Sequence, residues 1–258
     1  AFQAKGKLDE AIEACKKAIS LKPDHVAAYS NMGNALKDQD KLDEAIEAYK
    51  KAITLKPDYV NSYYNMGVAL KDQGKLDEAL EAYKKVISIN PNYVLAHSNV
   101  GNIFKNQGKI DKAIESYDKA ISIKPDHADA HLSLSNALLN CGRIEEGLNE
   151  YEWRWKTSNF LSMNRQFSKP LWDGKNSLHN KKLLLWCEQG VGDTISWSSN
   201  LSIISSQADR CILECQEKLV PLLKRSFPGI EVKPENRNFD LKRNDFDFHL
   251  PMGSIYKH

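Results

Sequence analysis

The chain has 258 residues, of which 41% are hydrophobic and 27% are charged. Apolar side chains in this proportion can build a hydrophobic core, which excludes an intrinsically disordered chain. The 36 Lys and Arg residues are balanced by 34 Asp and Glu residues without a block of either sign, so the composition indicates no nucleic-acid partner.

We expect neither a membrane segment nor a secretion signal. The most apolar run, Leu183 to Trp186, is far shorter than the roughly 20 residues that cross a bilayer. The five cysteines are odd in number and lack the C-x-x-C spacing of a zinc site. They therefore predict buried, reduced thiols, no metal site and a cytoplasmic protein.

A 34-residue repeat organises the first half of the chain. The segment KLDEAIEACKKAISLKPDH returns three times with few changes. Its proline keeps a constant step of 34 residues: Pro23, Pro57, Pro91 and Pro125. This step is the period of the tetratricopeptide repeat.

Each full repeat predicts two helices. In residues 26–59 the first helix carries Tyr29, Met32 and Leu36 on one face. The second helix has small residues at Ala45 and Ala52, which let the helices approach closely, and a Lys-Pro pair ends it. These positions resemble the tetratricopeptide-repeat family, which implies an α-helical solenoid whose concave groove is lined by the first helices.

The repeats set the predicted domain boundaries. We expect a solenoid over 1–156, with a partial repeat at 1–25, full repeats at 26–59, 60–93 and 94–127, and a degenerate capping repeat at 128–156. Residues 157–180 have turn chemistry and predict a linker, and 181–258 predict a small α/β half domain. Because the repeat pattern opens in the middle of a unit, we expect the chain to be a fragment of a longer protein.

Two rows of asparagines are predicted to line the groove. They recur at equivalent positions of the first helices and share one face: Asn31, Asn65 and Asn99 in one row, and Asn34, Asn102 and Asn136 in the other. An amide offers a donor and an acceptor to the backbone of an extended peptide. The alternative is that the amides bond neighbouring helices. Val68 and Ser133 interrupt the rows.

The stretch AYSNMGNALKDQDKLDEAIEAYKKAI resembles the repeats of the O-linked N-acetylglucosamine transferases. In that family an asparagine ladder holds protein substrates, so the resemblance implies a protein or peptide partner in the groove. The adjacent charges of Lys37, Lys71, Asp38 and Asp72 either add selectivity or form a solvated face. The sequence therefore predicts a peptide-binding module, and it leaves the oligomeric state open.

The second half of the chain has a different pattern. All five tryptophans lie beyond residue 150, and apolar runs at Lys182–Cys187, Cys211–Cys215 and Ile230–Val232 predict strands that alternate with helices in a parallel, Rossmann-like sheet. The turn Gly190–Asp193 matches the start of the dinucleotide fingerprint, but Ile195 replaces its third glycine. We therefore expect no nicotinamide cofactor, and the glycines either shape a tight turn or bind a ligand.

The stretch KKLLLWCEQGVGDTISW resembles the amino-terminal half of GT-B glycosyltransferases of the heptosyltransferase type. The resemblance implies that Asp193 takes a proton from an acceptor hydroxyl; the alternative role of this residue is a helix N-cap. It implies acceptor contacts from four neighbours: Glu188, Gln189, Gly190 and Gly192. Such enzymes bind their nucleotide-sugar donor mainly in a second half.

These resemblances lead to two functional hypotheses. The first is a protein-binding module that recruits substrate for a larger glycosyltransferase. The second is a glycosyltransferase fragment that shows no turnover alone, because the donor-binding half is missing from this chain. Neither hypothesis requires a cofactor in this chain.

Overall fold

The computed structural model of the protein describes residues 2–161, 163–188, 190–236 and 243–258, with side chains from residue 6 onward. It divides into two compact units, Ala1–Cys141 and Gly142–His258, which we name the helical unit and the sheet unit. The helical unit ends before residue 156, the predicted end of the solenoid. None of the helices in these described ranges combines the length and apolar character that a membrane crossing requires.

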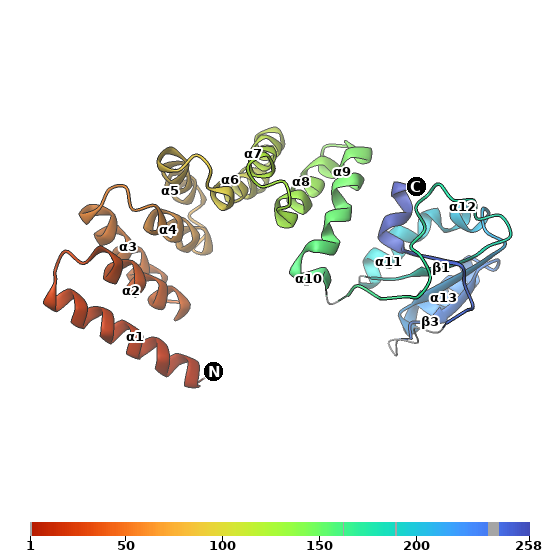
Figure 1. Cartoon of the computed structure of the whole chain (residues 1–258), viewed down its shortest axis with the longest axis horizontal. Helices are drawn as coiled ribbons and strands as arrows, with labels where there is room; N and C mark the ends of the chain where they lie inside the picture. Colours follow the sequence, from red (N-terminus) through yellow and green to blue (C-terminus); the bar gives the residue numbers. More distant parts are fainter. Residues whose placement is uncertain (1, 162, 189, 237–242) are drawn as a thin grey trace. The chain divides into compact units, whose positions relative to one another are not determined.

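The helical unit is a series of antiparallel helices that follow the 34-residue repeat (Figure 1). In chain order these are α1 (Phe2–Leu21), α2 (Val26–Asp38), α3 (Leu42–Leu55), α4 (Val60–Asp72), α5 (Leu76–Ile89), α6 (Val94–Asn106), α7 (Ile110–Ile123) and α8 (Ala128–Asn140). The predicted helical solenoid of tetratricopeptide type is confirmed in this unit. The helix α9 (Ile144–Tyr151), from the predicted capping repeat, belongs to the sheet unit.

A tyrosine of each second helix packs against a glycine of the first. Tyr49 is fully buried, and a Cβ on Gly33 would lie 2.5 Å from its ring. Tyr83 meets Gly67 in the same way, with the added Cβ at 2.7 Å. Only glycine allows the two helices to approach this closely.

The turn between the two helices of a repeat needs a residue in the left-handed region. Gly74 and Gly108 have φ angles of 76° and 72°, and glycine adopts this conformation without a steric penalty. Asp40 holds the equivalent place in the first full repeat with φ 63°. A side-chain Cβ makes this conformation less favourable there.

Successive repeats are also joined by an exposed hydrogen bond near these turns. In each case the amide of a glutamine donates to an aspartate of the preceding second helix: Gln39 to Asp9 at 2.7 Å, Gln73 to Asp43 at 2.9 Å and Gln107 to Asp77 at 2.9 Å. The bond recurs with the sequence repeat, so it fixes one register for the stacking of neighbouring repeats.

The sheet unit contains a four-stranded parallel sheet with the order β3-β2-β1-β4. The strands are β1 (Lys182–Trp186), β2 (Arg210–Cys215), β3 (Glu231–Pro234) and β4 (Phe248–Pro251). The first three match the predicted apolar runs, and β4 was not predicted. It contains His249 and Pro251, which weaken a strand pattern, and it stands at an edge of the sheet, where proline is tolerated.

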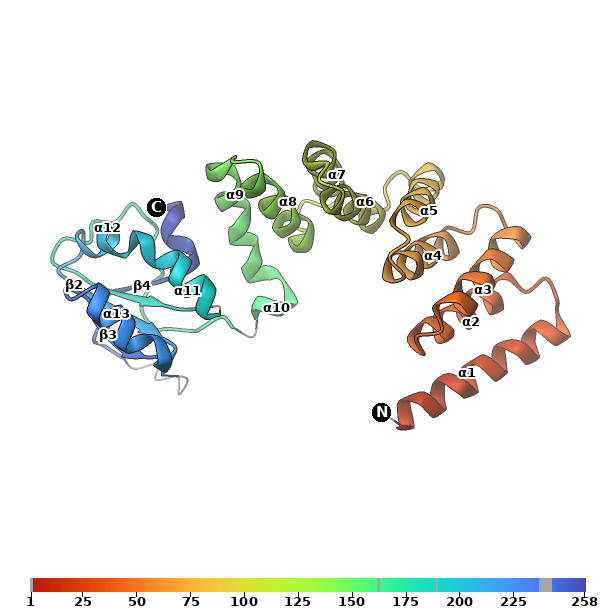
Figure 2. The ribbon, with the colours of Figure 1, turned by 180° about the vertical axis from the view of Figure 1, so that it is seen from behind.

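Helices cover one face of this sheet (Figure 2). They are α11 (Val191–Trp197), α12 (Leu201–Ser205) and α13 (Val220–Ser226), accompanied by the 3-10 turns η2 (Ser198–Asn200), η3 (Glu217–Leu219) and η4 (Met252–Lys257). Leu201 and Leu223 lie there in one buried apolar cluster with Leu183 and Leu185 of β1. The intervening Leu184 points to the opposite face, which Phe167 covers.

Residues before the sheet form part of the same unit. The helix α9 is followed by η1 (Glu152–Lys156) and α10 (Ser158–Leu161). Trp155 of η1 packs on Trp186 of β1, with ring centroids 5.6 Å apart. Trp155, which follows α9, therefore packs on the sheet.

Candidate functional site

The asparagines of the helical unit contact neighbouring helices. The Oδ1 atom of Asn34 accepts hydrogen bonds from the hydroxyl of Tyr49 at 2.8 Å and from Nδ2 of Asn65 at 2.9 Å. The Oδ1 atom of Asn102 accepts from the hydroxyl of Tyr117 at 2.8 Å. These amides thus connect the helices of one repeat, and in the case of Asn65 they connect two repeats.

Val68 interrupts this network in the middle of the unit. It takes the place that Asn34 and Asn102 hold in their repeats, and the hydroxyl of the fully buried Tyr83 has no hydrogen-bond partner in the described part of the chain. The Nδ2 atom of Asn99 donates instead to the hydroxyl of Tyr64 at 3.3 Å. One substitution therefore changes the bonding of two neighbouring side chains.

The surface that carries the two asparagine rows, which we name the asparagine face, stays partly available to a partner. Asn31 and Asn136 are exposed, and their side-chain amides make no hydrogen bond with another described residue. Among the described residues, Nδ2 of Asn34 and Oδ1 of Asn65 also have no partner. The face therefore offers unused donors and acceptors side by side, which is the chemistry that a peptide backbone requires.

The predicted acceptor site lies in the turn after β1. The helix α11 begins at Val191, so Gly190 is its N-cap and Asp193 lies in the first turn. Asp193 is exposed, and a carboxylate in this place complements the helix dipole. The N-cap role considered for Asp193 is wrong, because Gly190 occupies that position. Gln189 lies outside the described residues.

The backbone dihedral angles at the two glycines of this turn do not require glycine. Gly190 has an ordinary φ of −68°, and Gly192 is not among the glycines with positive φ. A Cβ added at Gly192 would meet no atom within 4 Å. Their presence is therefore not explained by a tight turn with unusual dihedral angles.

Glu188, predicted to contact an acceptor, is instead part of a buried ion pair. Its Oε1 accepts from Nη2 of Arg154 at 3.1 Å and from the backbone N–H of Gly253 at 2.9 Å. Arg154 is fully buried and also donates to Ser254 at 2.7 Å and to Glu152 at 2.6 Å. Burial raises the pKa of Glu188, although the arginine opposes this shift. The pair joins η1, the end of β1 and η4.

A second buried carboxylate lies at the same, carboxyl end of the strand pair, on the neighbouring strand. Glu214 of β2 is 2% exposed and accepts from Arg165 at 2.7 Å and from Arg243 at 2.6 Å. These contacts join residues far apart in the chain, so local sequence pattern does not predict them. Within the described ranges no three His, Cys, Asp or Glu residues are placed to hold a metal ion.

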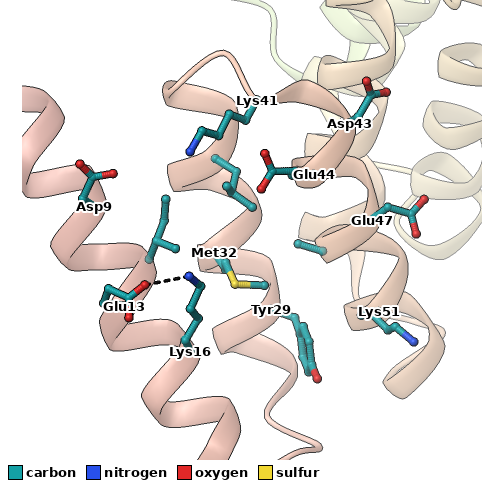
Figure 3. Close-up of a pocket in the computed structure, with 13 residues that line it drawn as sticks. Asp9, Glu13, Lys16, Tyr29, Met32, Lys41, Asp43, Glu44, Glu47 and Lys51 are labelled. Atoms are coloured by element: carbon teal, nitrogen blue, oxygen red, sulfur yellow. Dashed lines mark hydrogen bonds and ion pairs between the residues drawn. The ribbon is translucent and has the colours of Figure 1, made fainter.

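A pocket of about 710 Å³ that was not predicted from the sequence lies between α1, α2 and α3 (Figure 3). Met32 and Tyr29 of α2 line it, with Glu13 and Lys16 on one side and Glu44 on the other. Its walls come from three helices, so the pocket depends on their spacing, which periodicity does not specify. The feature of the sequence that could have indicated this pocket is the set of acidic residues at the outer positions of α1 and α3.

Comparison with known proteins identifies the repeat family of the helical unit. The family model described as TPR repeat matches residues 1–40, 33–74, 69–108 and 101–142. A crystal structure of MamA is 29% identical with a TM-score of 0.56, and the match covers 63% of this chain and 95% of that one. MamA from Desulfovibrio magneticus RS-1 is 20% identical with a TM-score of 0.52, covering 62% of this chain and 89% of that one.

A further solved structure of the same fold is that of YrrB, described as a TPR protein with an unusual peptide-binding site. It is 21% identical with a TM-score of 0.51, and the match covers 60% of this chain and 79% of that one. No curated protein matches the chain.

Proposed function

Since the chain belongs to the tetratricopeptide-repeat family, we propose that its helical unit binds an extended segment of a partner protein across the asparagine face. This face is defined by the two asparagine rows on α2, α4, α6 and α8. The observation that carries the proposal is the unused hydrogen-bonding capacity of the amides: a donor on Asn34, an acceptor on Asn65 and both on the exposed Asn31. The peptide-binding site described for YrrB, a protein of the same fold, supports it.

The existing bonds of the amides also favour this role. Asn34 is held by Tyr49 and Asn65 before any partner arrives, so its free N–H groups already point in a fixed direction. A fixed side chain loses less conformational entropy on binding than a mobile one. The same network that joins the helices therefore prepares the face for a peptide backbone.

The test is a selection of peptides from a random displayed library on the whole chain, followed by affinity measurements on variants. Asn31→Ala removes an exposed amide without a described partner, so we expect weaker binding and an unchanged melting temperature. Asn92→Ala, at an exposed asparagine in the turn before α6, is the matched control and should leave the affinity unchanged. Equal affinities of all selected peptides for both variants would contradict the proposal.

A second candidate function rests on the sheet unit. Asp193 is exposed just after the carboxyl end of β1, and open parallel sheets bind their ligands at these ends. We propose that the helical unit recruits protein substrate for sugar transfer, with Asp193 as the base and a nucleotide sugar bound by a further half of the enzyme. The five free cysteines fit a reducing, cytoplasmic location.

Transfer assays on this chain, alone and in a protein that includes the proposed donor-binding half, test this second function. With a panel of nucleotide sugars we expect no turnover from the chain alone. In the protein that includes the donor-binding half, Asp193→Asn should abolish turnover, and Asp209→Asn, at another exposed carboxylate of the sheet unit, should not. Full turnover by Asp193→Asn would exclude this residue as the base.

A further inference from the structure

The pocket between α1, α2 and α3 is separate from the asparagine face. Tyr29, Met32 and Leu36 line it from α2. At about 100° per residue, the middle of this group lies roughly 160° around the helix from the middle of the pair Asn31 and Asn34. One side of helix α2 therefore lines the pocket, and its opposite side carries Asn31 and Asn34 of the asparagine face.

The floor of the pocket is apolar. Ile12 of α1 and Leu36 of α2 are each 6% exposed, and the half-buried Met32 and Tyr29 lie beside them. Ala48 of α3 completes this floor with a small side chain. The pocket has a volume of about 710 Å³.

The rim of the pocket is mainly acidic. Five carboxylates line it against three lysines: Asp9, Glu13, Asp43, Glu44 and Glu47 against Lys16, Lys41 and Lys51. Lys16 already forms an ion pair with Glu13 at 2.7 Å, and the pKa of Lys16 is raised by Glu13 and, more weakly, by Glu44. The carboxylate of Glu44 accepts no hydrogen bond from another described residue, and the rim therefore favours a cationic ligand.

We propose that this pocket binds a basic amphipathic helix of a partner protein. The apolar side chains of that helix would rest on Met32 and Leu36, and its Lys or Arg side chains would pair with Glu44 and its acidic neighbours. An apolar floor between the walls α1 and α3 is the arrangement by which grooves bind amphipathic helices. The positive charge of the partner follows from the acidic rim. This surface would let the chain hold a second partner while the asparagine face is occupied.

The repeat supplies a substitution that the fold already tolerates. The position of Glu44 is occupied by Glu78 in the next repeat and by Lys112 in the one after it. Lys112 lies in the same place at the start of α7 as Glu44 does in α3. Glu44→Lys therefore reverses the charge at the rim with a side chain that this helix position accommodates elsewhere in the chain.

The probe is a labelled synthetic helix of about 14 residues, with Leu on one face and Lys on the other, whose binding is followed by fluorescence anisotropy. We expect Glu44→Lys to weaken its affinity about tenfold or more. Glu115→Lys makes the same change of charge at an exposed position of α7 and should change the affinity less than about twofold. Asn31→Ala should have no effect, which separates this site from the asparagine face.

Three results would overturn the proposal. The first is an equal loss of affinity in the two lysine variants, which would indicate attraction by the overall charge. The second is equally tight binding of a control helix with Glu in place of Lys. The third is no binding of the Leu/Lys helix at millimolar concentration by a chain whose circular dichroism shows the folded state.

Discussion

The Nδ2 atom of Asn65 donates to the Oδ1 atom of Asn34 at 2.9 Å, and this bond joins two successive repeats. The same oxygen accepts the hydroxyl of Tyr49, so one amide connects three helices. The next repeat has lost this arrangement because Val68 cannot accept a hydrogen bond. The helical unit thus contains an intact and an interrupted version of one network, and they can be compared by substitution.

Restoring the network should stabilise the chain. In Val68→Asn the new amide can accept the hydroxyl of Tyr83, which is buried without a described partner. One satisfied hydrogen bond contributes about 1 kcal/mol. Urea unfolding should therefore show a higher midpoint at the same slope. The reverse change, Asn34→Val, leaves the hydroxyl of Tyr49 unsatisfied and should destabilise by about 1–3 kcal/mol.

The left-handed turn residue gives a second prediction. Asp40 has φ 63° where the next two repeats have glycine, so Asp40→Gly removes a steric penalty of about 1 kcal/mol. We expect a small rise in the free energy of unfolding. Gly74→Asp, the mirror change in the next repeat, should lower it by a similar amount. A loss of stability in Asp40→Gly would show that a stabilising contact of the aspartate side chain outweighs the backbone penalty.

The glycines beside the tyrosine rings should not tolerate a side chain. In Gly67→Ala the new Cβ would lie 2.7 Å from the ring of Tyr83, and such overpacking costs about 1–3 kcal/mol. Gly6→Ala is the control, since nothing lies within 4 Å of its Cβ and alanine favours a helix. The melting temperature should fall in Gly67→Ala and rise in Gly6→Ala. Equal shifts would contradict a steric role of Gly67 beside the ring of Tyr83.

Breaking the buried ion pair between Arg154 and Glu188 in the sheet unit should lower the free energy of unfolding strongly, by an amount that depends on pH. Arg154→Met leaves Glu188 charged and buried, which costs about 3–5 kcal/mol, and Glu188→Gln in the same chain should recover part of this loss.

The sign of the pH dependence follows from the raised pKa of Glu188 in the folded state. A raised carboxyl pKa means that the folded state binds the proton more tightly, so stability falls as pH rises through the folded pKa. Without Arg154 this pKa rises further. The loss in free energy of unfolding caused by Arg154→Met should therefore be smaller at pH 5 than at pH 7.5. An equal loss at the two pH values would contradict this expectation.

The repeat determined most of what could be predicted. Helices α2 to α8 follow from a period of 34 residues with fixed positions for glycine, tyrosine and proline, and β1 to β3 follow from short apolar runs. The edge strand β4 was missed because His249 and Pro251 break its pattern. The helical segment between β1 and β2 is not one continuous helix, because the 3-10 turn η2 separates α11 from α12.

The roles of individual site residues were less predictable, for physical reasons. Glu188 stands next to the candidate turn in sequence, but its partners Arg154 and Gly253 come from distant segments. Local pattern therefore could not show that its carboxylate is engaged. The pocket between α1 and α3 likewise depends on the distance between helices, whereas the asparagine rows depend only on the repeat and were visible in the sequence.

The most direct test of peptide binding by the asparagine face is a titration of the labelled chain with a selected peptide, followed by the NMR signals of the side-chain amides. We predict that the Nδ2 signals of Asn31, Asn34 and Asn65 shift with the binding curve, while the methyl signals of Ile12 and Met32 in the pocket do not. A saturable titration in which the asparagine signals stay unchanged would show that the peptide binds elsewhere and would contradict the proposed function.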